Sequence, residues 1–196
     1  GRPWVILKSA LSLDGKIATR SGDSQWITGS KARDYVHQLR NRVDAVLIGA
    51  GTVRVDDPQL TVRLKKGGMK NPVRVIVVGK NSIPVSARVF NNADRERVIY
   101  ATATDLPLIR RNKLQKMGVE VLLIKRKKGQ VDLSQLMREL GTMGITSVMI
   151  EGGSEVSGNV LKEKLIDKII YFLAPKIIGG KDAPGPVGGK GISQLK

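Results

Sequence analysis

Short hydrophobic segments alternate with amphipathic ones along most of the chain. Most of the hydrophobic segments are rich in β-branched residues, which favour strands. The predicted strands are Val5–Leu11, Ala45–Ile48, Arg74–Val78, Arg97–Ala101, Val119–Ile124, Ser147–Glu151 and Ile169–Leu173. Several are hydrophobic throughout, as is typical of central strands covered on both faces in a largely parallel sheet. Strands that alternate with helical segments predict an α/β fold.

Three helices are predicted between these strands. The clearest begins at Ser30, which can cap it, and hydrophobic residues follow at helical spacing. A second is expected over Leu133–Leu140, with Asp132 as its cap and Gly141 closing it. A third is expected directly after the glycine pair 152–153.

His37 is the only histidine of the chain, and it lies close to the hydrophobic stripe of the first predicted helix. Histidine can serve as a catalytic acid, but an isolated helical histidine beside a core face is more often structural. We therefore leave His37 out of the predicted site.

Composition narrows the class of protein. The 196 residues are 41% hydrophobic, which suffices for one compact domain without disulfides or metals. The absence of cysteine excludes disulfides and thiolate metal sites and favours a reducing compartment, so we expect a cytoplasmic protein with no bound metal. No hydrophobic run approaches the roughly 20 residues that span a bilayer, so no membrane partner is expected.

The chain is strongly basic, with 34 Lys and Arg against 17 Asp and Glu and a net charge of +17. Such a charge suits nucleic acid, an acidic membrane or a small polyanionic substrate. The densest basic run, Lys125–Lys128, reads as a solvated loop. Aromatic residues make up only 4%, too few for stacking on single strands. A basic nucleic-acid-binding module is therefore the alternative of a different class, and no nucleic-acid partner is predicted.

Two glycine turns follow predicted strands. In residues 150–154 a strand runs through Gly152 and Gly153 into a helix start, which presents free backbone N–H groups to a phosphate. Gly49 and Gly51 form a second such turn. Each alone is equally an ordinary tight turn, but two in one α/β chain favour a dinucleotide. Neither matches the G-x-G-x-x-G fingerprint, so an ordinary Rossmann dehydrogenase is disfavoured.

Seven motifs occur in one order along the chain. They are residues 8–18, 21–28, 37–40, 44–53, 56–63, 150–153 and 174–180. Together they resemble the reductase domain of the bifunctional riboflavin biosynthesis deaminase/reductase family. The resemblance implies a dihydrofolate-reductase-like fold, in which a mixed, largely parallel sheet flanked by helices holds NADPH across the carboxyl ends of its strands.

The reaction that the resemblance implies is the NADPH-dependent reduction of 5-amino-6-(5-phosphoribosylamino)uracil to 5-amino-6-(5-phosphoribitylamino)uracil, with hydride transfer to C1′ of the ribose. The alternative is the stand-alone reductase that acts on 2,5-diamino-6-ribosylamino-pyrimidinone 5′-phosphate before deamination, because it shares these motifs. The expected partner is thus a small phosphorylated pyrimidine.

The resemblance also implies the site residues. The cofactor contacts are Ala10, Trp26, Thr52, Asp56, Gly79, Lys80, Gly152, Gly153, Ser154, Glu155, Val156, Ser157, Gly158 and Asn159. The substrate contacts are Ser24, Arg40, Leu60, Arg63 and Glu151. Two arginines suit a 5′-phosphate, because the guanidinium fork matches phosphate oxygens.

Lys8 and Glu151 are the predicted catalytic pair, since a buried Lys–Glu pair can donate the proton that the opening ribose needs. A structural ion pair is the alternative interpretation. At position 79 the family often has a serine, and here Lys80 and Asn81 are the candidates for the 2′-phosphate.

The domain organisation expected from the resemblance is a single reductase domain over residues 1–196, without the terminal pair of strands that family members carry. The zinc deaminase half needs cysteines and is not present in this sequence, although residues 1–3 resemble the junction that follows it. A strand edge left open in this way predicts a homo-oligomer.

Overall fold

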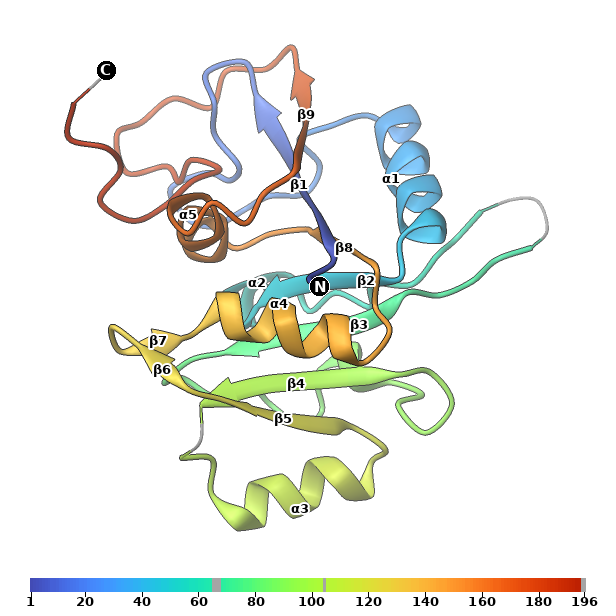
Figure 1. The fold of residues 1–196 in the computed structure, drawn as a ribbon. Coiled ribbons are helices and arrows are strands. Elements are labelled where there is room, and N and C mark those ends of the chain that lie inside the picture. Colours follow the sequence, from blue (N-terminus) through green and yellow to red (C-terminus); the bar gives the residue numbers. More distant parts are fainter. Residues whose placement is uncertain (65–67, 104, 195–196) are drawn as a thin grey trace.

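The computed structural model describes residues 1–64, 68–103 and 105–194. At its centre is a seven-stranded sheet of order β5-β4-β3-β2-β8-β1-β9 (Figure 1). The strands are β1 (Trp4–Ser12), β2 (Ala45–Gly49), β3 (Val73–Val78), β4 (Val98–Ala103), β5 (Glu120–Ile124), β8 (Ser147–Ile150) and β9 (Lys168–Ala174). All neighbouring strands of this sheet pair in parallel. The predicted strands are confirmed, each end within two residues.

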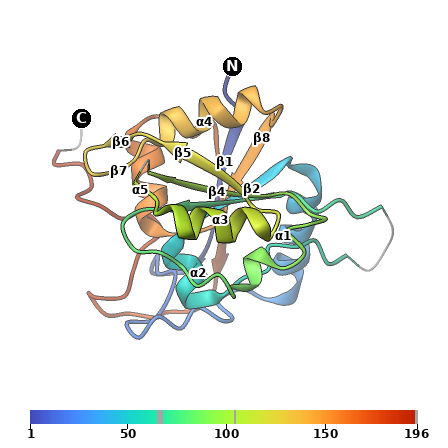
Figure 2. The same ribbon diagram turned by 90° about the horizontal axis from the view of Figure 1, so that it is seen from below.

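Helices cover both faces of the sheet (Figures 1 and 2). On one face lie α4 (Leu133–Thr142) and α5 (Ser154–Lys162), and on the other α1 (Ser30–Arg42), α2 (Ala50–Asp56), α3 (Leu108–Lys116) and the 3-10 helix η1 (Arg88–Phe90). Successive residues of the central strands point alternately into the two cores, as Leu47 and Ile48 do. The predicted α/β fold, a sheet flanked by helices, is confirmed.

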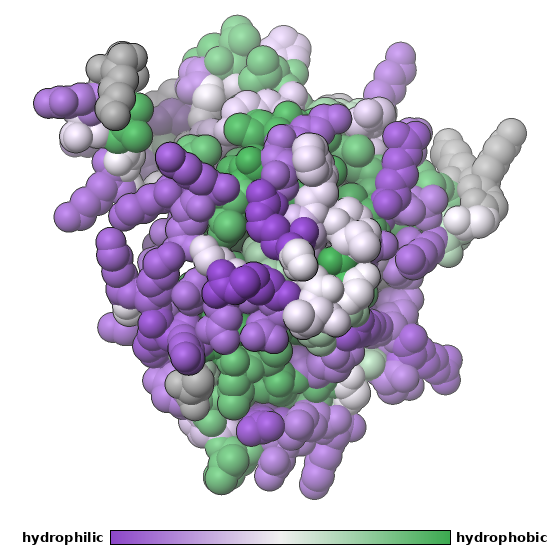
Figure 3. Space-filling model, viewed as in Figure 1, coloured by the Kyte–Doolittle hydropathy of each residue, from purple (hydrophilic) through white to green (hydrophobic). Residues whose placement is uncertain are grey.

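Outside the cores the surface is polar. Hydrophilic side chains cover most of the face seen in Figure 3, with smaller hydrophobic areas between them. The basic run 125–128 belongs to a hairpin of β6 (Arg126–Lys127) and β7 (Gln130–Val131), and its side chains are exposed, so part of the predicted loop is strand. Within the described ranges we find no helix with the length and apolar character to cross a membrane.

The helix ends differ in part from the prediction. Asp132 caps α4 as predicted and accepts the N–H of Gln135. Gly141 does not close this helix, because the last turn continues through Thr142. Ser30 does not cap α1; the extended Gly29 precedes it, and no side chain bonds the first turn.

Two α-helices of the described residues were not predicted. In α3 only Leu114 is buried, so the sequence shows no hydrophobic stripe. The other, α2, is seven residues long and lies within the predicted glycine turn.

The loop between β1 and α1 is fastened to the segment after β9. The Asp14 carboxylate accepts the N–H of Ile178 on Oδ1 at 3.0 Å and the N–H of Gly179 on Oδ2 at 2.7 Å. Hydrogen bonds from Ser12 and from these two N–H groups lower the pKa of Asp14 to about 2, below its ordinary value of 3.8. The loop that carries Ser24 and Trp26 is thereby held to the outer strand of the sheet.

We expect Asp14→Asn to lower the melting temperature, because an amide cannot offer two acceptor oxygens to the two N–H groups. The folded pKa is depressed, so the carboxylate stabilises the protein above the ordinary value of 3.8 and this contribution is lost as the pH falls towards 2. The melting temperatures of the two proteins, measured from about pH 7 to about pH 2.5, should therefore approach each other as the pH falls.

The control is Asp94→Asn, since this carboxylate is exposed and, within the described ranges, its one ion pair is with its neighbour Arg95. A difference in melting temperature between Asp14→Asn and the parent that stays constant over the pH range would contradict this role of the Asp14 carboxylate.

Candidate active site

The predicted catalytic pair lies at the carboxyl ends of β2 and β8, beside the middle of β1. Because β1, β2 and β8 are parallel, their carboxyl ends meet at one edge of the sheet, where α/β proteins bind ligands. In the register of β1 and β8, Leu7 stands opposite Ile150. Lys8 and Glu151, the next residues of each strand, are therefore neighbours.

A buried charged cluster forms around Glu151. Its Oε1 accepts from Arg40 Nε at 2.6 Å and its Oε2 from Arg40 Nη2 at 2.9 Å, while Lys8 Nζ lies 3.9 Å from Oε2. The side chains of Lys8, Arg40 and Glu151 are only 14%, 12% and 4% exposed. One carboxylate thus faces two cations in a site with little water.

The charges within this cluster set its protonation. Burial alone would raise the pKa of Glu151, but the charge and hydrogen bonds of Arg40, helped by Lys8 and His37, lower it below its ordinary value. Burial lowers the pKa of Lys8, and the charge of Glu151 offsets this decrease only in part. Glu151 is therefore ionised and can only accept, whereas Lys8, 3.9 Å from it, gives up a proton more readily than an exposed lysine.

Arg40 connects this cluster to the loop after α2. Its Nη1 donates to the carbonyl of Thr61 at 3.0 Å, in addition to the two bonds to Glu151. Counted over the described residues, three of its five N–H groups make hydrogen bonds, which leaves two for a ligand. The predicted contact of Arg40 with substrate stays a prediction, and the structure adds a role in orienting Glu151.

The other predicted substrate residues surround this loop. Leu60 is buried and has φ of 58°, in the left-handed region, while Arg63 is exposed and its Nη1 donates to Gln59 Oε1 at 3.2 Å. Ser24 donates to Asp56 Oδ1 at 3.0 Å, which brings a predicted substrate contact together with a predicted cofactor contact.

The two glycine turns lie side by side. Gly152 and Gly153 have φ of 141° and 84°, and a Cβ at Gly152 would come within 3.2 Å of Thr52 Oγ1 on α2. A Cβ at Gly49 would lie 2.9 Å from Val156 on α5. Glycine is thus required for the starts of α2 and α5 to approach each other.

The start of α5 fits the phosphates of a dinucleotide. Among the described residues no side chain caps its first turn, as is typical of a helix start that binds an anion. Glu155 is exposed, so its carboxylate has room to lie away from such a ligand. The residues present therefore suit the nicotinamide dinucleotide that the sequence predicts.

The rest of the predicted cofactor segment mainly packs. Val156 and Ser157 are buried, a Cβ at Gly158 would collide with the carbonyl of Gly188, and Asn159 Nδ2 donates to Gln130 Oε1 at 2.7 Å. The cofactor contacts predicted for these four residues stay predictions, since the contacts seen are within the protein.

The remaining predicted cofactor contacts lie in two places, near β9 and directly after β3. Trp26 stacks with Arg33, 4.6 Å from its ring, and lines a cavity of about 580 Å³ with β9. Ala10 pairs with Phe172 of β9 at that edge. Gly79 and Lys80 are exposed directly after β3, two strands beyond β8.

Two residues outside the prediction reach the loop of Leu60 and Arg63. His37 Nδ1 accepts the Arg63 N–H at 3.2 Å, and Asn71 Oδ1 accepts the Val62 N–H at 2.7 Å. His37 could have been found from the sequence because it belongs to the motif 37–40, whereas no local pattern marks Asn71.

Comparisons with known proteins agree over the whole chain. Residues 3–196 match the model of the RibD C-terminal domain family. The chain is 38% identical to the riboflavin biosynthesis protein RibD of Actinobacillus pleuropneumoniae, over 99% of this chain and 51% of that protein. It is 37% identical to the 2,5-diamino-6-ribosylamino-4(3H)-pyrimidinone 5′-phosphate reductase of Aquifex aeolicus, over 100% of this chain and 87% of that protein.

Among solved structures, Acinetobacter baumannii RibD superimposes with a TM-score of 0.84 at 34% identity, over 100% of this chain and 53% of that one. The chain therefore spans about half the length of the RibD proteins it matches and most of the length of the Aquifex reductase.

We expect Glu151→Gln to lower the free energy of unfolding by about 3 kcal/mol or more, because Arg40 and Lys8 would stay buried without a counter-charge. Urea denaturation of both proteins at neutral pH measures the difference. The matched control is Glu120→Gln, since Glu120 makes the same two-bond pair with Arg97, at 2.6 and 3.0 Å, on the surface. That change should cost under about 1 kcal/mol. Equal losses would show that the Glu151 cluster is solvated.

Proposed function

Because the chain belongs to the RibD C-terminal domain family, as its match over residues 3–196 shows, we propose that it is an NADPH-dependent reductase of riboflavin biosynthesis. Its substrate is 5-amino-6-(5-phosphoribosylamino)uracil, which it converts to the ribitylamino compound. The fold is dihydrofolate-reductase-like, in line with the RibD structures it resembles. The observation that carries the proposal is the buried Lys8–Glu151–Arg40 cluster beside two adjoining glycine turns.

The start of α5 holds the cofactor in this proposal. Its free N–H groups bind the pyrophosphate, and Thr52 contributes its hydroxyl beside Gly152. Lys80, exposed at the end of β3, reads the 2′-phosphate, which sets a preference for NADPH over NADH. When bound, NADPH supplies the hydride that C1′ of the substrate receives.

Lys8 is the proton donor of the proposed reaction. The bond between C1′ and the ring oxygen breaks, and that oxygen takes a proton from the Lys8 ammonium to become a hydroxyl group. Glu151 stays ionised beside it and keeps Lys8 oriented, because Arg40 fixes both carboxylate oxygens. Arg63, exposed at the end of its loop, binds the 5′-phosphate with the free N–H groups of Arg40.

The second candidate substrate is 2,5-diamino-6-ribosylamino-4(3H)-pyrimidinone 5′-phosphate, which appears in the name of the Aquifex relative covered over 87% of its length. Both candidates present the same phosphoribosylamino group to Lys8 and Arg63. They differ at the pyrimidine ring, so the choice between them is made by contacts to that ring.

The proposal is tested by incubating the purified chain with NADPH and each pyrimidine in turn while the absorbance of NADPH is followed. We expect turnover of the uracil compound, and a loss of about 100-fold or more in kcat for Lys8→Met, since a general acid contributes that much. Lys162→Met, an exposed change on α5, is the control and should match the parent. No turnover of either compound would contradict the proposed activity, and full activity of Lys8→Met would contradict the role of Lys8.

The same assay tests the cofactor. NADPH should give a higher kcat/KM than NADH, and Lys80→Ala should reduce this ratio about tenfold by removing one charge-assisted hydrogen bond. Lys128→Ala, an exposed change in the β6–β7 hairpin, should leave the ratio unchanged. A ratio of one in the parent would contradict the assignment of the 2′-phosphate.

We also propose that the protein is a homo-oligomer. In the described part of the chain β9 pairs on one side only, with β1, and carries the exposed Ile169, Tyr171 and Leu173. An open edge with hydrophobic side chains is a template for another strand, and a second copy can cover it. Light scattering should give a multiple of the chain mass of 21.3 kDa, and a monomer would contradict this proposal.

A further inference from the structure

The loop that carries Leu60 and Arg63 is held at three consecutive residues. Arg40 bonds the carbonyl of Thr61, Asn71 accepts the N–H of Val62, and His37 Nδ1 accepts the N–H of Arg63. These contacts come from two directions, because His37 and Arg40 belong to α1 whereas Asn71 follows the loop. The main-chain direction at Arg63 is therefore set by other side chains rather than by the loop itself.

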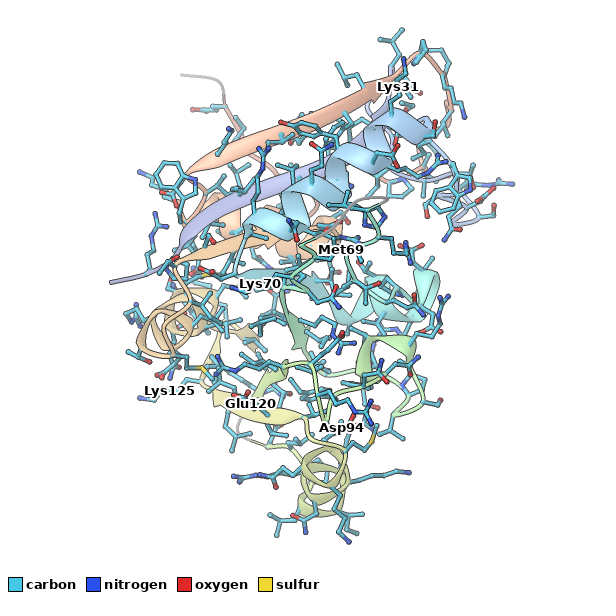
Figure 4. The ribbon with its side chains drawn as sticks, turned by 90° about the vertical axis from the view of Figure 1, so that its right-hand side faces the viewer. Lys31, Met69, Lys70, Asp94, Glu120 and Lys125 are labelled. Atoms are coloured by element: carbon cyan, nitrogen blue, oxygen red, sulfur yellow. The ribbon has the colours of Figure 1, made fainter. Side chains whose placement is uncertain are left out.

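Residues 69–71 are held as well, and Lys70 contacts α1. The N–H of Lys70 donates to Asn41 Oδ1 at 2.8 Å, and Figure 4 shows Met69 and Lys70 beside this helix. Asn71 in turn donates to Glu96 Oε1 at 2.6 Å. Lys70 and Asn71 thus have partners of their own, and the bond to His37 holds the main chain at Arg63.

His37 lies on the face of α1 that points to the charged cluster. It precedes Arg40 by three residues, so the two side chains project from the same side of the helix. The charged groups that face it are Arg40, Arg63 and Glu151. Of the three side chains that hold the loop, only His37 gains a charge as the pH falls below 6.5.

Protonation of His37 would disrupt the site. Burial, followed by the charges of Arg40 and Arg63, lowers the pKa of His37 below 6.5, although Glu151 and a hydrogen bond to Thr61 oppose this. At neutral pH the ring is therefore neutral and Nδ1 is an acceptor. A proton on Nδ1 would remove the acceptor and place a third positive charge beside two arginines.

We propose that His37 is a positioning residue, which in its neutral form aligns Arg63 with the phosphate of the substrate and on protonation lets this loop end go. The proposal rests on the proposed function, because it assigns the phosphate to Arg63. It gives His37 a role in affinity for the phosphorylated sugar and none in proton transfer to the ribose. Protonation of His37 should therefore raise KM for the substrate and leave kcat and NADPH affinity unchanged.

The test compares His37→Ala, which removes the acceptor, with His37→Asn, whose Oδ1 accepts at the position of Nδ1 but does not titrate. At neutral pH we expect KM to rise about fivefold in His37→Ala, the loss of one hydrogen bond, and to stay near the parent value in His37→Asn. Changes in kcat should be under about twofold in both, since chemistry is untouched. Gln38→Ala, the exposed neighbour on α1, is the matched control.

The pH profile separates positioning from simple packing. The substrate phosphate itself titrates near pH 6, so its effect on KM appears in every protein. The ratio of KM in the parent to KM in His37→Asn removes that effect, and it should rise as the pH falls from about 7.5 to about 5. A ratio that stays constant over this range would overturn the proposal, and so would an equal rise in KM for the dephosphorylated substrate.

A measurement without substrate tests the positioning of Arg63 independently of the proposed reaction. Amide exchange at Arg63, followed by NMR without any ligand, should be faster in His37→Ala than in the parent and in His37→Asn. Unchanged exchange in His37→Ala would overturn the proposal even if the enzyme turns over. Faster exchange in a protein without reductase activity would support the positioning of Arg63 and contradict only the assigned reaction.

Discussion

The buried carboxylate of Glu151 constrains this molecule more than any other group. A carboxylate that leaves water is costly unless it is paired and hydrogen-bonded, and Arg40 meets both requirements with two bonds. To do so, α1 must lie beside the end of β8 and the middle of β1, where Glu151 and Lys8 meet. Arg40 also bonds Thr61, so the loop after α2 must follow α1. The need to pair one buried carboxylate thus determines how a helix, two strands and a loop are arranged at the candidate site.

The sequence predicts the sheet well because burial on both faces leaves a local pattern. Several strands, β2 among them, are continuous runs of β-branched and hydrophobic residues, and Ile76 and Val75 of β3 point into different cores. The helix α3 leaves no such pattern, since Leu114 alone is buried and most other residues are basic or polar. At Ser30 the preference for a capping side chain misplaced the cap by one residue, because the extended Gly29 starts α1 without one.

Only part of the site could be predicted, because several of its contacts join residues that are far apart in the sequence. The proximity of Lys8 and Glu151 follows from parallel strands, and the glycine turns were visible as motifs. The bidentate pair between Arg40 and Glu151 joins residues 111 positions apart, and no local pattern encodes it. For the same reason the bond between His37 and Arg63 could not be inferred from the helix on which His37 lies.

The segment after β9 touches two parts of the site at fixed points. Asp14 holds Ile178 and Gly179, and further along Gly188 donates its N–H to the carbonyl of Ser154 at 2.8 Å. The residues between these points form a strap of set length rather than a free surface loop. Surface loops usually accept insertions and deletions at little cost, but a strap fastened at both ends transmits any change of length to its anchors. Variation in length within this fold is therefore accommodated more easily at the tip of the β6–β7 hairpin than between Gly179 and Gly188.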